Sequence, residues 1–209
     1  STSHGGGGAG GGGAAATAAG GNAHVLAAVD DGVYEGGGAL CFVTEHCAGA
    51  ELFTQLTGGD GAENYTEADA RALVRQVLEA VAHVHARGVV HRDVTDYAFV
   101  FAARDSIDTL KLCDFAFATR ADTANATGAL SEPPMGGTPE YQAPELHAGG
   151  AAYGAAADVW SAGVLAYALI AGALPFSDAN SVRLAQRVQK GEHRAMDGAN
   201  WAAASDDAK

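Results

Sequence analysis

The sequence has little positive charge. It contains 12 lysine and arginine residues against 25 aspartate and glutamate residues, which gives a net charge of −13. Its lysines are Lys111, Lys190 and Lys209. Nucleic acids and anionic membranes are themselves negatively charged, so a chain this acidic is a poor partner for either. We therefore expect no nucleic acid and no membrane among its partners.

Cysteine is also scarce, and long apolar runs are missing. Cys41, Cys47 and Cys113 are odd in number and lack metal-ligand spacing, which predicts reduced thiols in an intracellular, cytoplasmic protein. The sequence shows no apolar run of membrane-spanning length, no signal peptide and no EF-hand calcium loop. These absences argue against a disulfide framework, a membrane-spanning segment and a calcium loop within these residues.

The first 21 residues are nearly all glycine and alanine. Such a segment buries too little apolar surface to offset the entropy of ordering, so 1–21 is expected to be disordered. It satisfies a glycine-rich nucleotide-loop pattern at Gly5, Gly7 and Gly10, but no strand flanks it, and we reject the match. The remaining residues, 22–209, are enough for one domain with a sizeable core.

Hydrophobic spacing predicts the main elements of this domain. Thr66 is a suitable N-cap for a helix over 66–87, whose apolar residues recur at helical spacing and which Gly88 ends. Two short strands, 99–101 and 109–112, flank a polar turn. The segment 158–171 is apolar nearly all round, which is typical of a buried helix.

Four motifs follow one another along the chain. They are His91-Arg92-Asp93, Asp114-Phe115-Ala116, Gly137-Thr138-Pro139-Glu140-Tyr141-Gln142-Ala143-Pro144-Glu145 and Asp158-Val159-Trp160-Ser161-Ala162-Gly163. In this order and at this spacing they resemble the protein kinase family of the serine/threonine type. The segment 174–209 is most similar to the calcium/calmodulin-dependent group, including the plant-type calcium-dependent kinases.

The resemblance implies an α+β, protein-kinase-like fold that is mostly the helical large lobe, with a remnant of the small-lobe sheet. The small-lobe remnant and hinge are expected over 22–47, with strands near 24–26, 33–35 and 40–45, and the large lobe over 48–209. Nothing in the chain resembles the small-lobe strand that carries the phosphate-anchoring lysine. The domain is therefore expected to be incomplete at both ends.

The same resemblance implies a set of site residues, with ATP and magnesium as cofactors and a protein partner or protein substrate. Asp93 is the expected catalytic base, within a catalytic loop over 91–98, and Asp114 the expected metal ligand. The expected catalytic residues are His91, Arg92 and Asp93, and the expected nucleotide-binding residues are Thr44, Glu45, Cys47, Glu51 and Val100. Two of these have a simpler alternative: Glu51 as an acid favoured by the first turn of a helix, and Asp93 as a brace for its own loop.

Other residues have expected positions rather than expected chemistry. The resemblance places Phe115 against His91, and Asp158 as a buried acid that binds backbone N–H groups of the catalytic loop. The activation segment is expected over 114–145, with Arg92 positioned to receive a phosphate. Candidate phosphorylation sites are Thr119, Thr123, Thr127 and Ser131, and Glu132 is a hypothetical permanent substitute for the phosphate.

Two positions depart from the family pattern where chemistry depends on them. Thr95 stands where the catalytic-loop lysine is expected, and Ala98 where the second metal-binding residue is expected. Losing one preorganised charge contact typically costs about 10²–10³ in rate. These losses favour a pseudokinase or severely impaired kinase that acts by binding or scaffolding. The alternative is an active ATP-dependent serine/threonine kinase of the calcium/calmodulin-dependent group, seen as a fragment.

Overall fold

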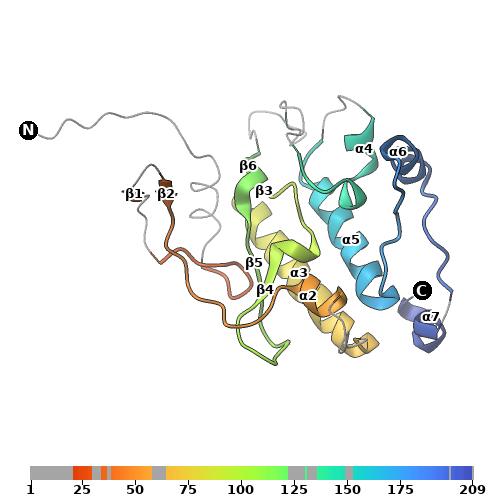
Figure 1. The fold of residues 1–209 in the computed structure, drawn as a ribbon, viewed down its shortest axis with the longest axis horizontal. Coiled ribbons are helices and arrows are strands. Elements are labelled where there is room, and N and C mark those ends of the chain that lie inside the picture. The colour runs from red at the N-terminus through yellow and green to blue at the C-terminus, as the bar shows by residue number, and fades with distance from the viewer. Residues whose placement is uncertain are drawn as a thin grey trace, which may run out of the picture.

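The structure is a computed structural model that describes residues 21–29, 34–36, 39–57, 65–121, 130, 136–148, 153–197 and 199–208. The segment expected to be disordered, 1–21, lies outside the described residues except for Gly21. The helices gather on one side of the molecule with short strands along their edge, and one hairpin stands apart from them (Figure 1). This arrangement confirms the expected α+β fold, which is dominated by helices and has a few short strands.

The longest helix, α3 (Glu67–Ala86), confirms the prediction for 66–87 almost to the residue. Thr66 caps it: its side chain accepts a hydrogen bond from the Asp69 amide, and the Asp69 side chain accepts one from the Thr66 amide. This reciprocal pair satisfies two N–H groups that have no partner inside the helix. The chain leaves the helix through Gly88, whose φ of +68° suits glycine.

The core lies where α3 packs against α5 (Ala156–Ala171). Buried side chains from both helices form one cluster with the neighbouring strands, among them Leu73, Val77, Val84, Ala162, Leu165 and Leu169. The expected burial of α5 is confirmed for most of its length, but Val159 is 53% exposed, so this helix does have an open side. None of the helices in the described part of the chain combines the length and apolarity needed to cross a bilayer.

Two antiparallel strand pairs position the loops beside this core. The two predicted strands are present: β4 (Phe99–Phe101) pairs with β5 (Leu110–Leu112), and Phe99 lies opposite Leu112. β3 (Val89–Val90) pairs with β6 (Thr119–Arg120), which ties the residues before the catalytic loop to those after Asp114. The side chains of Phe99, Phe101, Leu110 and Leu112 are all fully buried.

The expected small-lobe strands are only partly correct. β1 (Tyr34–Gly36) pairs with β2 (Ala39–Cys41), so the strand predicted over 40–45 ends early. The segment 24–26 is not a small-lobe strand: it runs along β5, where the Leu26 amide donates to the Leu112 carbonyl and the Leu112 amide to the His24 carbonyl, both at 2.9 Å. Val25 is fully buried there, because β5 offers an open edge next to the core.

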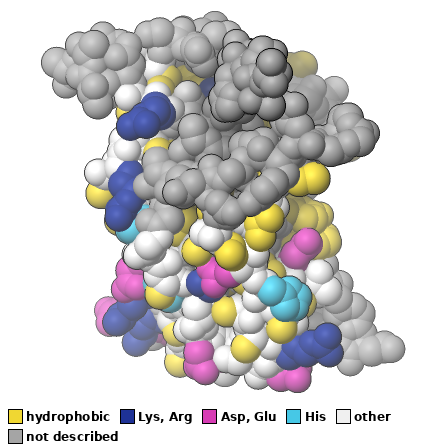
Figure 2. Space-filling model, turned by 90° about the vertical axis from the view of Figure 1, so that its left-hand side faces the viewer, with side chains coloured by type: hydrophobic (Ala, Val, Ile, Leu, Met, Phe, Trp, Pro, Cys, Tyr) yellow, Lys and Arg dark blue, Asp and Glu magenta, His cyan; other side chains and the backbone are white. Residues whose placement is uncertain are grey.

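The remaining elements connect these layers. In chain order they are α2 (Leu52–Thr57), η1 (Asp96–Ala98), η2 (Phe115–Phe117), η3 (Pro139–Tyr141), α4 (Pro144–His147), α6 (Ser181–Lys190), α7 (Ala199–Ala203) and η4 (Asp206–Ala208). On the face turned toward the β1–β2 end, the coloured side chains of both charges are interspersed with hydrophobic ones (Figure 2).

The Thr66 cap gives a test of the helix that carries the core. Thr66→Ala is expected to destabilise the protein by about 1 kcal/mol, because the first turn of α3 loses its side-chain acceptor. For a chain of this size, that is a melting temperature lower by roughly 2–4 °C. Thr54→Ala is the matched control, since Thr54 is exposed within α2, and it should leave the melt unchanged. Equal melts for the two variants would contradict the capping assignment.

Candidate functional site

A buried carboxylate holds the start of the catalytic loop. Asp158, at the first turn of α5, is 1% exposed and accepts hydrogen bonds from the backbone amides of His91 and Arg92, each at 2.8 Å. His85 of α3 adds a third contact, with Nε2 2.7 Å from Asp158 Oδ2. The structure thus confirms the buried role predicted for Asp158, and it assigns His85 a structural role too.

His91 points into the interior. It is fully buried, its Nε2 lies 3.0 Å from the Cys113 carbonyl oxygen, and its ring meets Phe115 edge-on with centroids 4.9 Å apart. The predicted contact between His91 and Phe115 is therefore confirmed. This contact brings the segment that contains Asp114 beside the catalytic loop.

Asp93 faces the Gly137–Thr138 segment. Its Oδ1 accepts two hydrogen bonds from Thr138, one from the backbone amide and one from the hydroxyl, both at 3.0 Å. Gly137 allows this approach: its φ is +100°, and an added Cβ would lie 3.2 Å from the Arg92 carbonyl oxygen. Asp93 therefore joins the catalytic loop to the end of the activation segment, rather than bracing only its own loop. Both bonds end on Oδ1, and no described residue donates to Oδ2.

Asp114 is exposed and has a left-handed backbone, with φ 56° and ψ 67°. Its Oδ1 accepts a hydrogen bond from the Ala116 amide at 3.3 Å. Thr95 and Ala98, which differ from the family pattern, are 1% and 3% exposed. Neither side chain has a carboxylate or amide oxygen that could join Asp114 in binding a metal. Within the described residues, no group of three or more His, Cys, Asp or Glu could hold a metal ion. The donor set thus fits the metal of a nucleotide poorly.

The expected hinge, 45–47, is fastened by an ion pair that the sequence did not reveal. Lys111 of β5 places Nζ 2.9 Å from Glu45 Oε1, and the Ala27 amide donates to the same oxygen at 2.8 Å. Burial opposes the charged form, but the Ala27 amide and the Lys111 ammonium together hold the pKa of Glu45 below its ordinary value. Thr44, expected among the nucleotide-binding residues, is exposed and forms an isolated bridge with Ala28.

Two of the predicted residues, Glu51 and Val100, meet where the chain after the hinge runs along β4. Glu51 forms a bridge with Val100, and the Gly49 amide donates to the Phe101 carbonyl at 3.1 Å. Burial, followed by the charges of Asp114, Cys47 and Glu51, raises the pKa of Cys113 to about 12. Cys47, Glu51 and Asp114 thus lie near enough to Cys113 to act on its charge, and Glu51 pairs with Val100. Glu51 is exposed and directly precedes α2.

Lysine contributes little to this site. Of the two lysines in the described part of the chain, Lys111 is paired with Glu45, and Lys190 lies at the end of α6 beside Glu192. A nucleotide triphosphate needs positive charge to balance its phosphates. The lysines described here supply none to the space between Asp93 and Asp114.

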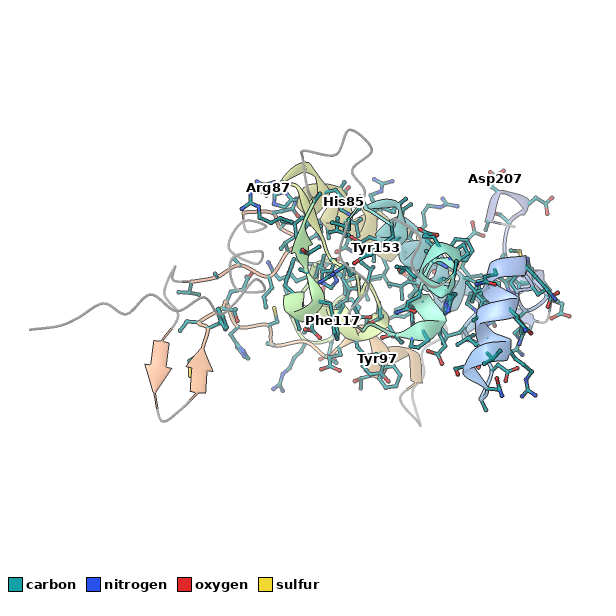
Figure 3. All side chains as sticks on the ribbon, turned by 90° about the horizontal axis from the view of Figure 1, so that it is seen from above. His85, Arg87, Tyr97, Phe117, Tyr153 and Asp207 are labelled. Carbon is teal, nitrogen blue, oxygen red and sulfur yellow. The ribbon has the colours of Figure 1, made fainter. Side chains whose placement is uncertain are left out.

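Arg92 is bound by neutral oxygens. Its backbone is left-handed, with φ 70°, its Nε donates to the Phe117 carbonyl, and its Nη1 donates to the Tyr153 hydroxyl at 2.9 Å. Phe117 and Tyr153 lie toward the same central region in Figure 3. Of the predicted phosphorylation sites, Thr119 is in β6. Thr123, Thr127, Ser131 and the hypothetical substitute Glu132 lie outside the described residues.

A buried acid, Asp96, was missed in the sequence. It follows Thr95 in the catalytic loop, is 7% exposed, and faces the hydroxyl of Tyr141. Neither Asp96 Oδ1 nor Tyr141 Oη has a partner of good hydrogen-bond geometry. Burial raises the pKa of Asp96, while the Tyr141 hydroxyl and the amides of Asp96 and Tyr97 act in the opposite direction. No sequence pattern marks this pair, because it forms only when the two loops meet.

Comparison with known proteins gives one consistent answer. The family model described as "Protein kinase domain" matches residues 26–209. The chain is 38% identical over 176 residues to calcium/calmodulin-dependent protein kinase type 1 of Macrobrachium nipponense, covering 84% of this chain and 48% of that protein. It is 38% identical over 163 residues to maternal embryonic leucine zipper kinase of Xenopus tropicalis, covering 77% and 23%.

A plant relative is equally similar. Putative CBL-interacting protein kinase 13 of Oryza sativa subsp. japonica is 38% identical over 153 residues, covering 73% of this chain and 28% of that protein. The chain thus spans less than half the length of each of these three relatives.

The ion pair at the hinge gives a first test of the site. Lys111→Met is expected to lower the free energy of unfolding by about 1–3 kcal/mol, because Glu45 and the Ala23 carbonyl lose a charged donor. Hydrogen exchange should also quicken at the Glu45 amide. Lys190→Met is the control, since the Lys190–Glu192 pair is exposed and 3.7 Å long. If both variants melt alike, the Lys111 pair does not hold the hinge.

Asp96 gives a test that depends on pH. Its raised pKa means that the folded state holds the proton more tightly, so Asp96 costs stability as pH rises above its ordinary value of 3.8. Asp96→Asn should therefore melt higher than the wild type at pH 7, with the difference shrinking as pH falls toward 4. Asp105→Asn, at an exposed loop position, should show no such gain. A lower melting temperature for Asp96→Asn at pH 7 would refute a strained buried carboxylate.

Proposed function

The chain belongs to the protein kinase domain family, with serine/threonine kinases of the calcium/calmodulin-dependent group among its relatives, and we propose that its phosphoryl transfer is absent or severely impaired. The observation that carries this proposal is the pair of buried side chains at Thr95 and Ala98, inside an otherwise well-formed catalytic loop. The domain then acts by binding or scaffolding a protein partner, and we expect this to happen in the cytoplasm.

The chemistry supports this conclusion. Phosphoryl transfer depends on positioning and on neutralising charge, and there is little other work for the protein to do. Asp93 Oδ2 can still orient a hydroxyl and Asp114 can still offer one carboxylate, but Ala98 offers no oxygen and Thr95 no positive charge. Two such losses at about 10²–10³ each, even when not additive, reduce the rate by roughly 10⁴. Such a turnover is too slow for signalling by phosphorylation.

A binding role agrees with the surface. Large hydrophobic side chains are exposed on several elements of the helical lobe, namely Leu78 on α3, Val159 on α5 and Val182 on α6. The net charge of −13 favours proteins over nucleic acid or anionic lipid as partners.

The second candidate is an active serine/threonine kinase that uses ATP and magnesium. The observation in its favour is the edge-on contact of His91 with Phe115, which keeps the residue after Asp114 beside the catalytic loop. The chain spans less than half the length of these relatives, so this alternative also requires residues of a longer protein.

The deciding experiment is a thermal melt with ATP, with and without magnesium. If phosphoryl transfer is impaired as proposed, ATP should cause no magnesium-dependent shift in the melting temperature of the wild type. Ala98→Asn, which supplies the missing side-chain oxygen, should gain such a shift, and Ala98→Ser is the smaller control. A ligand at a hundred times its dissociation constant stabilises by about 2.7 kcal/mol, so true binding is easily seen. Each variant is first melted without nucleotide to check that it folds.

A turnover assay completes the test. Asp93→Asn keeps an acceptor for Thr138 but cannot serve as a base, so it separates bracing from catalysis. The proposal predicts that wild type and Asp93→Asn transfer phosphate equally poorly. A magnesium-dependent shift in the wild type that disappears in Asp114→Asn, with turnover that disappears in Asp93→Asn, would establish the active kinase instead.

A further inference from the structure

The guanidinium of Arg92 has only neutral partners among the described residues. Its Nε donates to the Phe117 carbonyl and its Nη1 to the Tyr153 hydroxyl, and no described carboxylate forms an ion pair with it. Arg92 is half-buried, so water satisfies only part of its hydrogen-bonding capacity. The Tyr153 hydroxyl therefore occupies one of the directions from which an anion would approach this arginine.

Tyr153 also contacts the activation segment through its backbone. The Leu130 amide donates to the Tyr153 carbonyl at 2.7 Å, and the two residues form an antiparallel bridge. Their side chains share a buried cluster with Val90, Ala143 and Ala157. Tyr153 is 3% exposed. One residue thus contacts the catalytic loop with its side chain and the activation segment with its main chain.

We propose that Tyr153 is a positioning residue that ties the activation segment at Leu130 to Arg92 without a phosphate. The hydroxyl accepts from Arg92 Nη1, which is an N–H group that would otherwise be open to a phosphoryl group on the segment. Leu130 is then held in place by the folded core, and no phosphate is needed to hold it there. This inference concerns how the loops are held, so it is independent of whether the domain transfers phosphate.

The buried position of the hydroxyl favours the tyrosine over an incoming phosphate. The hydroxyl is delivered by a buried side chain whose position is set by the cluster around Val90, so it needs no further ordering. A phosphate would have to displace it and lose its own hydration in the process.

The first arm of the test removes one oxygen. Tyr153→Phe should lower the melting temperature by on the order of 5 °C, because a hydrogen bond to a charged donor is lost inside the protein. Hydrogen exchange at the Leu130 amide should become about tenfold faster, which corresponds to the same loss. Tyr97→Phe is the matched control: Tyr97 is 51% exposed in η1 and stacks on Phe53, a contact that phenylalanine preserves.

The second arm asks whether phosphate and the hydroxyl compete for Arg92. Inorganic phosphate at millimolar concentration, compared with chloride at equal ionic strength, should not stabilise the wild type. It should raise the melting temperature of Tyr153→Phe and slow exchange at Leu130 again. This rescue should disappear in the double variant Tyr153→Phe/Arg92→Gln. Loss of packing alone would not produce a rescue that requires Arg92.

Two results would overturn the proposal. One is Leu130 exchange in Tyr153→Phe that matches Tyr97→Phe, since the hydroxyl would then hold nothing. The other is phosphate stabilisation of the wild type that Arg92→Gln removes, because Arg92 would then be open to an anion. The wild-type arm decides the matter by itself if Tyr153→Phe does not fold.

Discussion

The carboxylate of Asp158 is the constraint on which the candidate site depends. A carboxylate buried this deeply must find donors, and backbone amides in a loop must find an acceptor, so each satisfies the other. The left-handed backbone of Arg92 costs free energy for a residue other than glycine. It persists because, in this conformation, the amides of His91 and Arg92 both reach Asp158. The geometry of the catalytic loop is thus imposed from α5.

Helical spacing in the sequence predicted α3, and the family resemblance predicted the contact of His91 with Phe115. What the sequence missed are contacts between distant segments that no motif marks. The pairs Lys111–Glu45 and Asp96–Tyr141 join distant segments, so no local pattern announces them. The segment 24–26 was assigned to the wrong layer because a short apolar run fits any open strand edge.

Folding roles explain why the site keeps its form while it departs from the chemistry of its family. Asp93 holds Thr138, and His91 holds the carbonyl of Cys113, whatever else either residue does. Thr95 and Ala98 are buried, and their side chains make no polar contact that the fold requires. The residues that match the family pattern are those that also make contacts within the fold. The two that differ, Thr95 and Ala98, stand at positions whose family role is to bind the nucleotide or its metal.

The path from His24 to Ala50 begins and ends on the same pair of strands. At its start, His24 and Leu26 bond to Leu112 of β5, and at its end the Ala50 carbonyl accepts from Phe101 of β4. The segment 24–50 is therefore attached to the helical lobe at both of its ends. A single cleavage of the backbone between 30 and 40 would therefore leave both new chain ends attached to the helical lobe. The cleaved protein would keep the apparent molecular size of the intact chain until it is unfolded.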